Sequence, residues 1–138
     1  MNPKTRVIHI VHEWALAEAV IEYLVEKGKK RLRRLVLGFG ELQSIDKEVF
    51  MFALENLLKE NNIVVDSIET RTIKARFKCR RCGYEWGLKD IDMDDTIKEA
   101  IHFLPETVHA FVSCPSCNSI DYDIVRGRGL TIEEIEER

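Results

Sequence analysis

Four cysteines are the residues whose types and spacing most clearly predict chemistry. They form two pairs of the same spacing, Cys79-x-x-Cys82 and Cys114-x-x-Cys117, and the chain has no other cysteine. Each pair turns two sulfur atoms toward one point, and two pairs together form the tetrahedral thiolate site that Zn(II) occupies in structural zinc domains. Because such a site has no open coordination position, we expect a structural zinc ion rather than a catalytic one.

The same spacing leaves other uses of the thiols open. The chain has no secretory signal and no apolar run of about 18 residues, so we expect a reducing, cytoplasmic environment in which disulfides are rare. Tetrahedral sulfur also holds iron, and the two knuckles resemble those of rubredoxin, which transfers electrons. A further alternative is a zinc-ribbon module that binds nucleic acid.

The charge distribution gives little support to a nucleic-acid partner. The chain of 138 residues carries a net charge of −3, whereas general nucleic-acid binding needs a basic surface. A basic cluster does run from Lys27 to Arg34. Cations at the end of a helix complement its dipole, so this cluster favours a solvated helix end over a phosphate site. We expect neither a nucleic-acid partner nor a membrane partner.

Apolar periodicity predicts three helices that must position these side chains. Residues 12–27 carry an apolar stripe with helical spacing, and Gly28 is expected to end this helix. A second helix is expected to begin after Asp46, which serves as its N-cap, and to end at residues 61–62. A third helical pattern covers residues 92–103, with Asp94 or Asp95 available as its N-cap.

The remaining regular segments have the alternation of strands. Residues 34–42 are expected to form a strand whose glycines allow another backbone or a helix to approach closely. Residues 63–78 are expected to form a long strand with a bulge or hinge near Arg71–Thr72, where the alternation changes phase. Residues 122–132 have β character interrupted by two glycines, and they are expected to pair with the first domain.

These elements predict an α+β fold, with a small mixed sheet and two helices plus an inserted zinc-ribbon-like domain. Residues 1–76 and 119–138 are expected to form an α/β domain, and residues 77–118 a zinc-binding domain with an insertion between its two knuckles. Zinc binding contributes roughly 10–16 kcal/mol in small zinc modules, so the inserted segment can be ordered with only a small core.

Short motifs in a characteristic order point to a known family. They are Val11-His12-Glu13-Trp14-Ala15-Leu16-Ala17, Gly40-Glu41-Leu42-Gln43, the two cysteine pairs and Arg126-Gly127-Arg128-Gly129. From about residue 11 to residue 132, the chain resembles the HypA family of nickel metallochaperones, which mature nickel-iron hydrogenases. The resemblance implies that His12 and Glu13 bind Ni(II) transiently in the α/β domain. It also implies a HypB-type GTPase and the hydrogenase large subunit as partners.

The chemistry of the implied nickel motif depends on where the chain begins. A histidine at the second position offers the terminal amine, its own backbone amide and its imidazole as a planar set of nitrogen ligands, which Ni(II) accepts and Zn(II) does not prefer. Val11 occupies the initiator position of the family. The valine codon GTG also initiates translation with methionine, so Val11 is a candidate start. If residues 1–10 are present, His9 is a candidate substitute ligand.

Two further assignments have ordinary structural alternatives. His102 ends the predicted third helix and is a candidate nickel ligand, or else a surface or domain-contact histidine. Glu13 supports the nickel site through its backbone amide or its carboxylate, or else simply complements the dipole of the helix. The sequence contains no nucleophile with a matched base and no phosphate-binding glycine loop, so we expect no enzyme.

Overall fold

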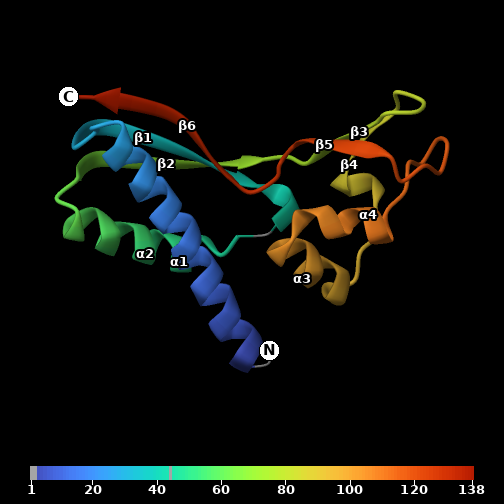
Figure 1. Cartoon of the computed structure of the whole chain (residues 1–138), viewed down its shortest axis with the longest axis horizontal. Coiled ribbons are helices and arrows are strands. Elements are labelled where there is room, and N and C mark those ends of the chain that lie inside the picture. Colours follow the sequence, from blue (N-terminus) through green and yellow to red (C-terminus); the bar gives the residue numbers. More distant parts are fainter. Residues whose placement is uncertain (1–2, 44) are drawn as a thin grey trace. The chain divides into compact units, whose positions relative to one another are not determined.

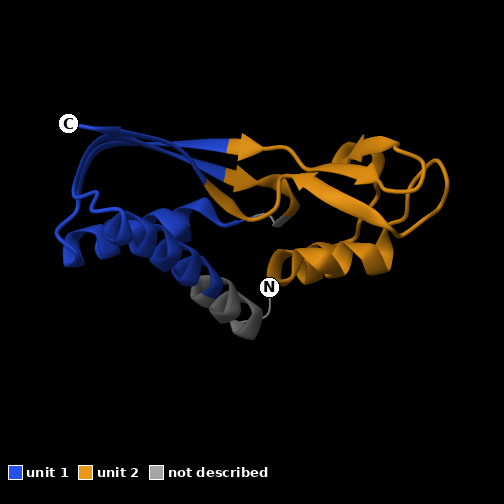
Figure 2. Cartoon of the chain, turned by 45° about the horizontal axis from the view of Figure 1, so that its top comes forward, with its two compact units in different colours: residues 1–38, 45–71, 132–138 blue, residues 39–44, 72–131 orange. Residues whose placement is uncertain are grey.

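The computed structural model describes the backbone of residues 3–43 and 45–138, and the side chains of residues 12–42 and 45–138. The chain forms two compact units (Figure 2). The first comprises Met1–Gly38, Ile45–Arg71 and Ile132–Arg138, and the second comprises Phe39–Ser44 and Thr72–Thr131. These boundaries differ from the predicted ones, because the second unit extends beyond residues 77–118 on both sides and includes a short segment between the first strand and the second helix. No helix among the described residues has both the length and the apolar content that a bilayer crossing needs.

Helix α1 (Pro3–Glu26) begins the first unit. Its buried stripe contains Ala17, Val20 and Leu24, as the periodicity predicts. Gly28 ends the helix in a left-handed conformation with φ of 67°, and its N–H donates to the carbonyl of Val25. The predicted start at residue 12 was wrong. Proline is favoured at the first position of a helix, and residues 4–11 contain no glycine or proline that would interrupt it.

Helix α2 (Lys47–Glu60) follows the predicted cap, because the Asp46 carboxylate accepts the Val49 N–H at 3.2 Å. Its apolar face buries Phe50 and Leu54 completely. Helices α1 and α2 pack together and lie on the same side of the sheet (Figure 1). Trp14 on α1 meets Phe52 on α2 edge to face, with ring centroids 6.3 Å apart, so the two rings contribute to the packing of the helices.

The sheet beneath these helices has the strand order β2-β1-β6. Strand β1 (Arg31–Gly40) is central and buried from Leu35 to its end, whereas β2 (Val64–Ile73) and β6 (Leu130–Glu137) are its edges. The prediction that residues 122–132 pair with the first domain holds only from Leu130 onward, in β6. Residues 122–126 instead pair with a strand of the second unit, so this part of the prediction was wrong. Charged side chains join the three strands. Arg34 pairs with Glu69, Glu134 and Glu136, and Arg71 pairs with Glu134.

The second unit contains an antiparallel sheet of order β4-β3-β5. Its strands are β3 (Arg76–Cys79), β4 (Glu85–Gly87) and β5 (Tyr122–Arg126). Helix α3 (Asp95–Phe103) begins at the predicted cap Asp94, whose carboxylate accepts the Ile97 N–H at 2.9 Å. The short helices are η1 (Glu41–Gln43), η2 (Leu88–Asp90), η3 (Pro105–Thr107) and α4 (Val108–Phe111). One buried cluster joins these elements, and it includes Leu42, Phe77, Trp86, Ile101, Val108 and Tyr122.

The predicted long strand of residues 63–78 is divided. Strand β2 ends at Ile73, β3 begins at Arg76, and the boundary between the units lies between Arg71 and Thr72, close to the predicted hinge. The connection packs tightly, since a Cβ on Gly127 would lie 2.4 Å from the Ala75 Cα. Within the second unit, the Glu41 carboxylate accepts the Ala75 N–H at 2.9 Å.

Glycine also permits the close approach predicted for the end of β1. A Cβ on Gly40 would lie 2.4 Å from the Gly127 carbonyl oxygen. With no side chain in the way, the Gly40 N–H donates to the Gly129 carbonyl at 2.7 Å, and the Leu42 N–H donates to that of Gly127 at 3.1 Å. These bonds attach the end of β1 to the loop between β5 and β6, within the second unit.

Candidate metal centres

Two turns of the same geometry position the four cysteines in the second unit. Cys79 is the last residue of β3, and its carbonyl accepts the Gly83 N–H at 3.0 Å. Cys114 follows α4, and its carbonyl accepts the Asn118 N–H at 2.8 Å. Gly83 and Asn118 both have positive φ, of 78° and 64°. Each turn therefore closes on a left-handed residue immediately after its second cysteine, a position where glycine and asparagine carry the least strain.

The two turns bring the four sulfur atoms together. The Sγ atoms of Cys79 and Cys117 are 3.5 Å apart, those of Cys82 and Cys114 are 3.6 Å apart, and all four lie within 4.8 Å of one another. A disulfide would need about 2.05 Å. A zinc ion with bonds of about 2.3 Å to four sulfurs at tetrahedral corners gives sulfur separations of about 3.8 Å. The donor set therefore fits Zn(II), as the spacing predicts.

The pKa values of the thiols explain why these sulfurs need a cation. A hydrogen bond from the Cys82 backbone lowers the pKa of Cys79 to about 6. A backbone hydrogen bond from Ser119 also lowers the pKa of Cys117, but loss of solvent and the three neighbouring sulfurs outweigh it and raise that pKa to about 12. Sulfurs at this distance repel one another as thiolates, so full ionisation of the set requires a divalent ion among them.

The surroundings hold the cysteine turns in place. Cys79 and Cys114 are buried in the core of the second unit, whereas Cys82 and Cys117 are exposed. Trp86 is buried in the same cluster as Cys79 and Cys114 and stacks on Phe77, with ring centroids 5.5 Å apart. Trp86 is thus part of the core of the second unit. The Tyr122 hydroxyl donates to the Val112 carbonyl at 2.9 Å, and burial raises the pKa of this tyrosine to about 12.

An ion-pair cluster also links the two ends of the thiol site. Arg80, between the first two cysteines, pairs with Asp121 at 3.4 Å and with Asp123 in a closer contact. Both carboxylates follow the second cysteine pair in the sequence. Sequence analysis missed this cluster, because Arg80 is more than 40 residues from both carboxylates and no local pattern relates them.

The predicted nickel residues lie on α1 in the first unit. His12 is partly exposed, whereas Glu13 is fully buried. A ring nitrogen of His12 and a carboxylate oxygen of Glu13 lie within 4.8 Å of each other. The Glu13 Oε2 atom accepts the backbone N–H of Asp46, the residue that caps α2. Sequence analysis missed this bond, because its donor is a main-chain group that no side-chain pattern identifies.

The other candidate histidines are placed differently. His102 lies in the last turn of α3 in the second unit, 4% exposed, with its ring centroid 5.0 Å from that of Phe103. Its assignment to nickel stays a prediction. The side chains of His9 and Val11 lie outside the described residues. His109 Nδ1 is 3.0 Å from the Ile120 carbonyl oxygen, and its ring packs on Tyr122, which gives this histidine a structural role.

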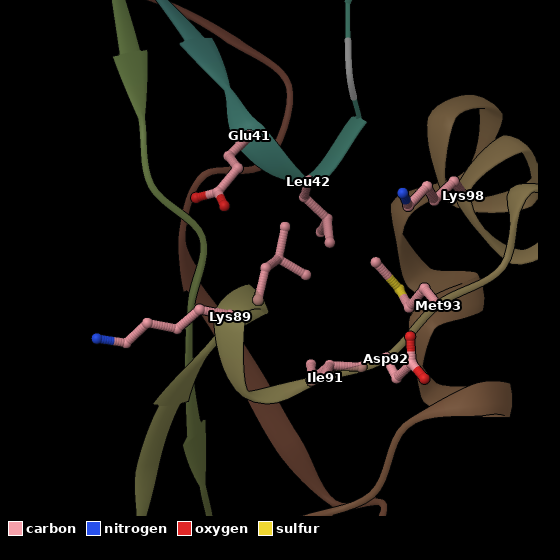
Figure 3. A pocket seen from close by; sticks show the side chains of 8 residues that line it. Glu41, Leu42, Lys89, Ile91, Asp92, Met93 and Lys98 are labelled. Carbon is pink, nitrogen blue, oxygen red and sulfur yellow. The ribbon is translucent and has the colours of Figure 1, made fainter.

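A separate pocket of about 380 Å³ lies within the second unit. Figure 3 shows Leu42 and Met93 pointing into it, and Lys89 pointing away. Asp92 and Lys98 contribute opposite charges to its rim. A pocket with apolar walls and with both a positive and a negative charge at its rim favours no single class of ligand, and we assign no ligand to it.

Comparison with known proteins relates the chain to one family. The family described as "Hydrogenase/urease nickel incorporation, metallochaperone, hypA" matches residues 11–137. A "Hydrogenase maturation factor HypA" of Thermococcus onnurineus is 43% identical over 132 residues, covering 91% of this chain and 95% of the relative. One of Pyrococcus furiosus is 40% identical over 131 residues, covering 91% and 94%.

Solved structures agree in fold. The "Solution structure of the Ni metallochaperone HypA from Helicobacter pylori" matches with a TM-score of 0.58 at 19% identity, covering 91% of this chain and 96% of that chain. A second one, the "Solution structure of HypA protein", has the same TM-score at 20% identity. At these identities the similarity shows the fold alone. With the family match over nearly the whole length and relatives at about 40% identity, this chain belongs to the HypA family of hydrogenase maturation factors.

Proposed function

We propose that this chain is a cytoplasmic nickel metallochaperone, which binds Ni(II) through the segment at His12 and Glu13 and releases it for nickel-iron hydrogenase maturation. Membership of a nickel-incorporation family points to a role in metal delivery rather than to an enzyme. The observation that carries the proposal is the His12–Glu13 pair at the front of the family match, with a partly exposed imidazole beside a buried carboxylate. The metal is cargo, so its site must both bind and release it.

The ligand set follows from the state of the backbone at His12. In a helix each N–H donates to a carbonyl four residues earlier, so the amide nitrogens of His12 and Glu13 are held within α1 when it begins at Pro3. A chain that begins at position 11 instead offers the terminal amine, the His12 amide and its imidazole in one plane. We propose this planar set as the nickel site. Glu13 would then act through its backbone amide, while its carboxylate holds α1 against the start of α2.

We propose that His102 contributes a further ligand in one state of the carrier. The support is chemical: a second imidazole suits Ni(II), and His102 is a buried polar residue at the end of α3. The cysteine set would hold structural Zn(II), which keeps the second unit folded and leaves the imidazoles for nickel. A HypB-type GTPase and the hydrogenase large subunit are the proposed partners, because a carrier of this family needs a donor or helper and a recipient.

The test of the nickel site is a titration of zinc-loaded protein with Ni(II), followed by calorimetry and by metal analysis. Two forms are compared, the 138-residue chain and a form that begins with methionine at position 11. His12→Ala in the short form should abolish tight nickel binding and leave one zinc per chain, and His109→Ala, a matched loss of one imidazole, should leave both metals bound. Unchanged nickel affinity in the His12 variant would refute the proposed site.

The same samples test the other proposals. Planar nitrogen coordination gives a diamagnetic nickel centre with a characteristic visible band, which should occur only in the short form. His102→Ala should weaken nickel binding without removing that band; an unchanged affinity would remove His102 from the ligand set. A colourless zinc-loaded protein excludes the iron alternative, because iron bound by four thiolates absorbs strongly in the visible range. Delivery is tested by nickel transfer to a purified large subunit, with and without the GTPase.

A further inference from the structure

Strand β2 presents a long open edge in the first unit. In the order β2-β1-β6 it has a neighbour on one side only, and it runs for 10 residues. Among the residues that the structure describes, no strand pairs with its outer side. An edge of this length offers a row of main-chain donors and acceptors to another strand, so natural proteins usually protect it with charge, lysine, proline or a bulge.

The two edges of this sheet differ in such protection. Strand β6 carries four glutamates, Glu133, Glu134, Glu136 and Glu137, so a second β6 beside it would place like charges together. Strand β2 also carries charged residues, Asp66, Glu69 and Arg71, but they are of both signs and need not repel a second strand. It has no lysine, proline or glycine, and its first residue, Val64, is 48% exposed. The edge at β2 is therefore the one that is left open to association.

The charges on β2 complement those of a second, antiparallel β2. In such a dimer the two copies of β2 are related by a two-fold axis that passes beside one central residue. A residue on one side of this centre then lies opposite the residue of the other copy that is equally far on the other side. If that residue is Thr70, Glu69 of each copy lies opposite Arg71 of the other, and the two Thr70 side chains meet. A centre at Glu69 would place two carboxylates opposite each other. A centre at Ile68 would place Glu69 opposite Ser67, without an ion pair.

We propose that two copies of this chain associate through β2, antiparallel about Thr70, so that their sheets form one continuous sheet. Residues 67–73 of the two strands would pair, with Ile68 opposite Thr72 and two Glu69–Arg71 ion pairs. Both charged side chains remain available for this, because Glu69 is 45% exposed and Arg71 is 44% exposed although each also has a partner within its own chain. The occupant of the edge is thus a second copy rather than a different protein.

The first test reverses the charges and measures mass by light scattering after size-exclusion chromatography, on the zinc-loaded full chain. Glu69→Arg or Arg71→Glu places like charges opposite each other twice, which should raise the dimer dissociation constant about tenfold or more. The double variant restores opposite charges and should restore the dimer. Glu60→Arg, the same charge change at an exposed residue at the end of α2, should have no effect. Circular dichroism confirms that each variant is folded.

The second test fixes the register with single cysteines, while zinc keeps the native thiols coordinated. Thr70→Cys should form a covalent dimer under mild oxidation, because the two copies of position 70 face each other across the axis. Ser67→Cys should not, since its two copies lie roughly 20 Å apart along the strands. A protein that stays monomeric at millimolar concentration would overturn the proposal, as would a dimer that tolerates both charge reversals or cross-links through position 67. A monomer whose β2 pairs with another protein would overturn it as well.

Discussion

Replacement of Glu13 separates its structural role from a role in nickel binding. Its carboxylate is fully buried on α1 and accepts the backbone N–H of Asp46, which caps α2. The bond therefore joins the two helices at the point where α2 begins. Glu13→Gln keeps the shape and a neutral oxygen acceptor, whereas Glu13→Ala removes the acceptor altogether. Glu18→Gln, at an exposed position of the same helix, is the matched control.

The size of the effect follows from the type of hydrogen bond. A bond to an ionised acceptor contributes roughly 1.5–3 kcal/mol, and a neutral one about 1 kcal/mol. We expect Glu13→Gln to lower the free energy of unfolding by about 1–2 kcal/mol. Glu13→Ala also leaves the Asp46 N–H without this acceptor and opens a small cavity, so we expect a loss of about 2–4 kcal/mol. The control should stay within about 0.5 kcal/mol of the parent.

Urea unfolding followed by circular dichroism gives these free energies, and calorimetry on the same samples gives the nickel affinity. If Glu13 acts through its backbone amide, nickel affinity in Glu13→Gln stays within about threefold of the parent, although the protein is less stable. A tenfold loss of nickel affinity at unchanged stability would refute this reasoning and identify the carboxylate as a ligand. An alanine variant as stable as the parent would show that the bond to Asp46 contributes nothing.

Three further predictions concern the second unit. Cys82→Ser should reduce bound zinc from one per chain toward zero in metal analysis with a competing chelator, and full retention would contradict the four-thiolate site. Gly127→Ala should lower the free energy of unfolding in urea by about 2–3 kcal/mol, because its Cβ would lie 2.4 Å from a backbone carbon and its φ is 86°. The control is Gly28→Ala in the first unit, where φ is 67° and the surrounding space is open. This change should lower the free energy of unfolding by only about 1 kcal/mol. The hydrogen bond from Arg80 lowers the pKa of Asp123 below its ordinary value of 3.8. The stabilisation that this bond gives the folded state is therefore complete above pH 3.8 and is lost as the pH falls through the lowered pKa. Arg80→Met should raise the pKa of Asp123 toward 3.8 in a carboxyl NMR titration.

Helix ends and turns were predicted correctly where neighbouring residues in the sequence determine them. The cap Asp46 was identified, and Asp94 was one of two caps predicted for α3, because a short acceptor side chain stands immediately before an apolar periodic run. The end of α1 at Gly28 was identified for an equally local reason, since glycine takes the left-handed conformation at low cost. The thiol site was predicted from spacing alone, because two identical turns determine where four sulfurs point.

Features that depend on distant main-chain groups could not be predicted in this way. The Glu13 carboxylate binds a backbone N–H far along the chain, and any residue except proline would supply that donor. Segment 39–44 joins the second unit because Leu42 enters its core, yet Leu42 is also compatible with the alternation of a strand. The start of α1 was misplaced because residues 4–11 have no strong helical stripe, and only Pro3 indicates a beginning.

The division of the chain between the units has a consequence for synthesis on the ribosome. The main part of the second unit, Thr72–Thr131, is translated before Ile132–Arg138, and β6 emerges after every other element. All four cysteines are therefore available to a metal ion while the first sheet still lacks one of its strands. A nascent chain stalled before residue 130 should protect its thiols from alkylation and leave β1 without one neighbour, so the unit that contains His12 and Glu13 is completed last.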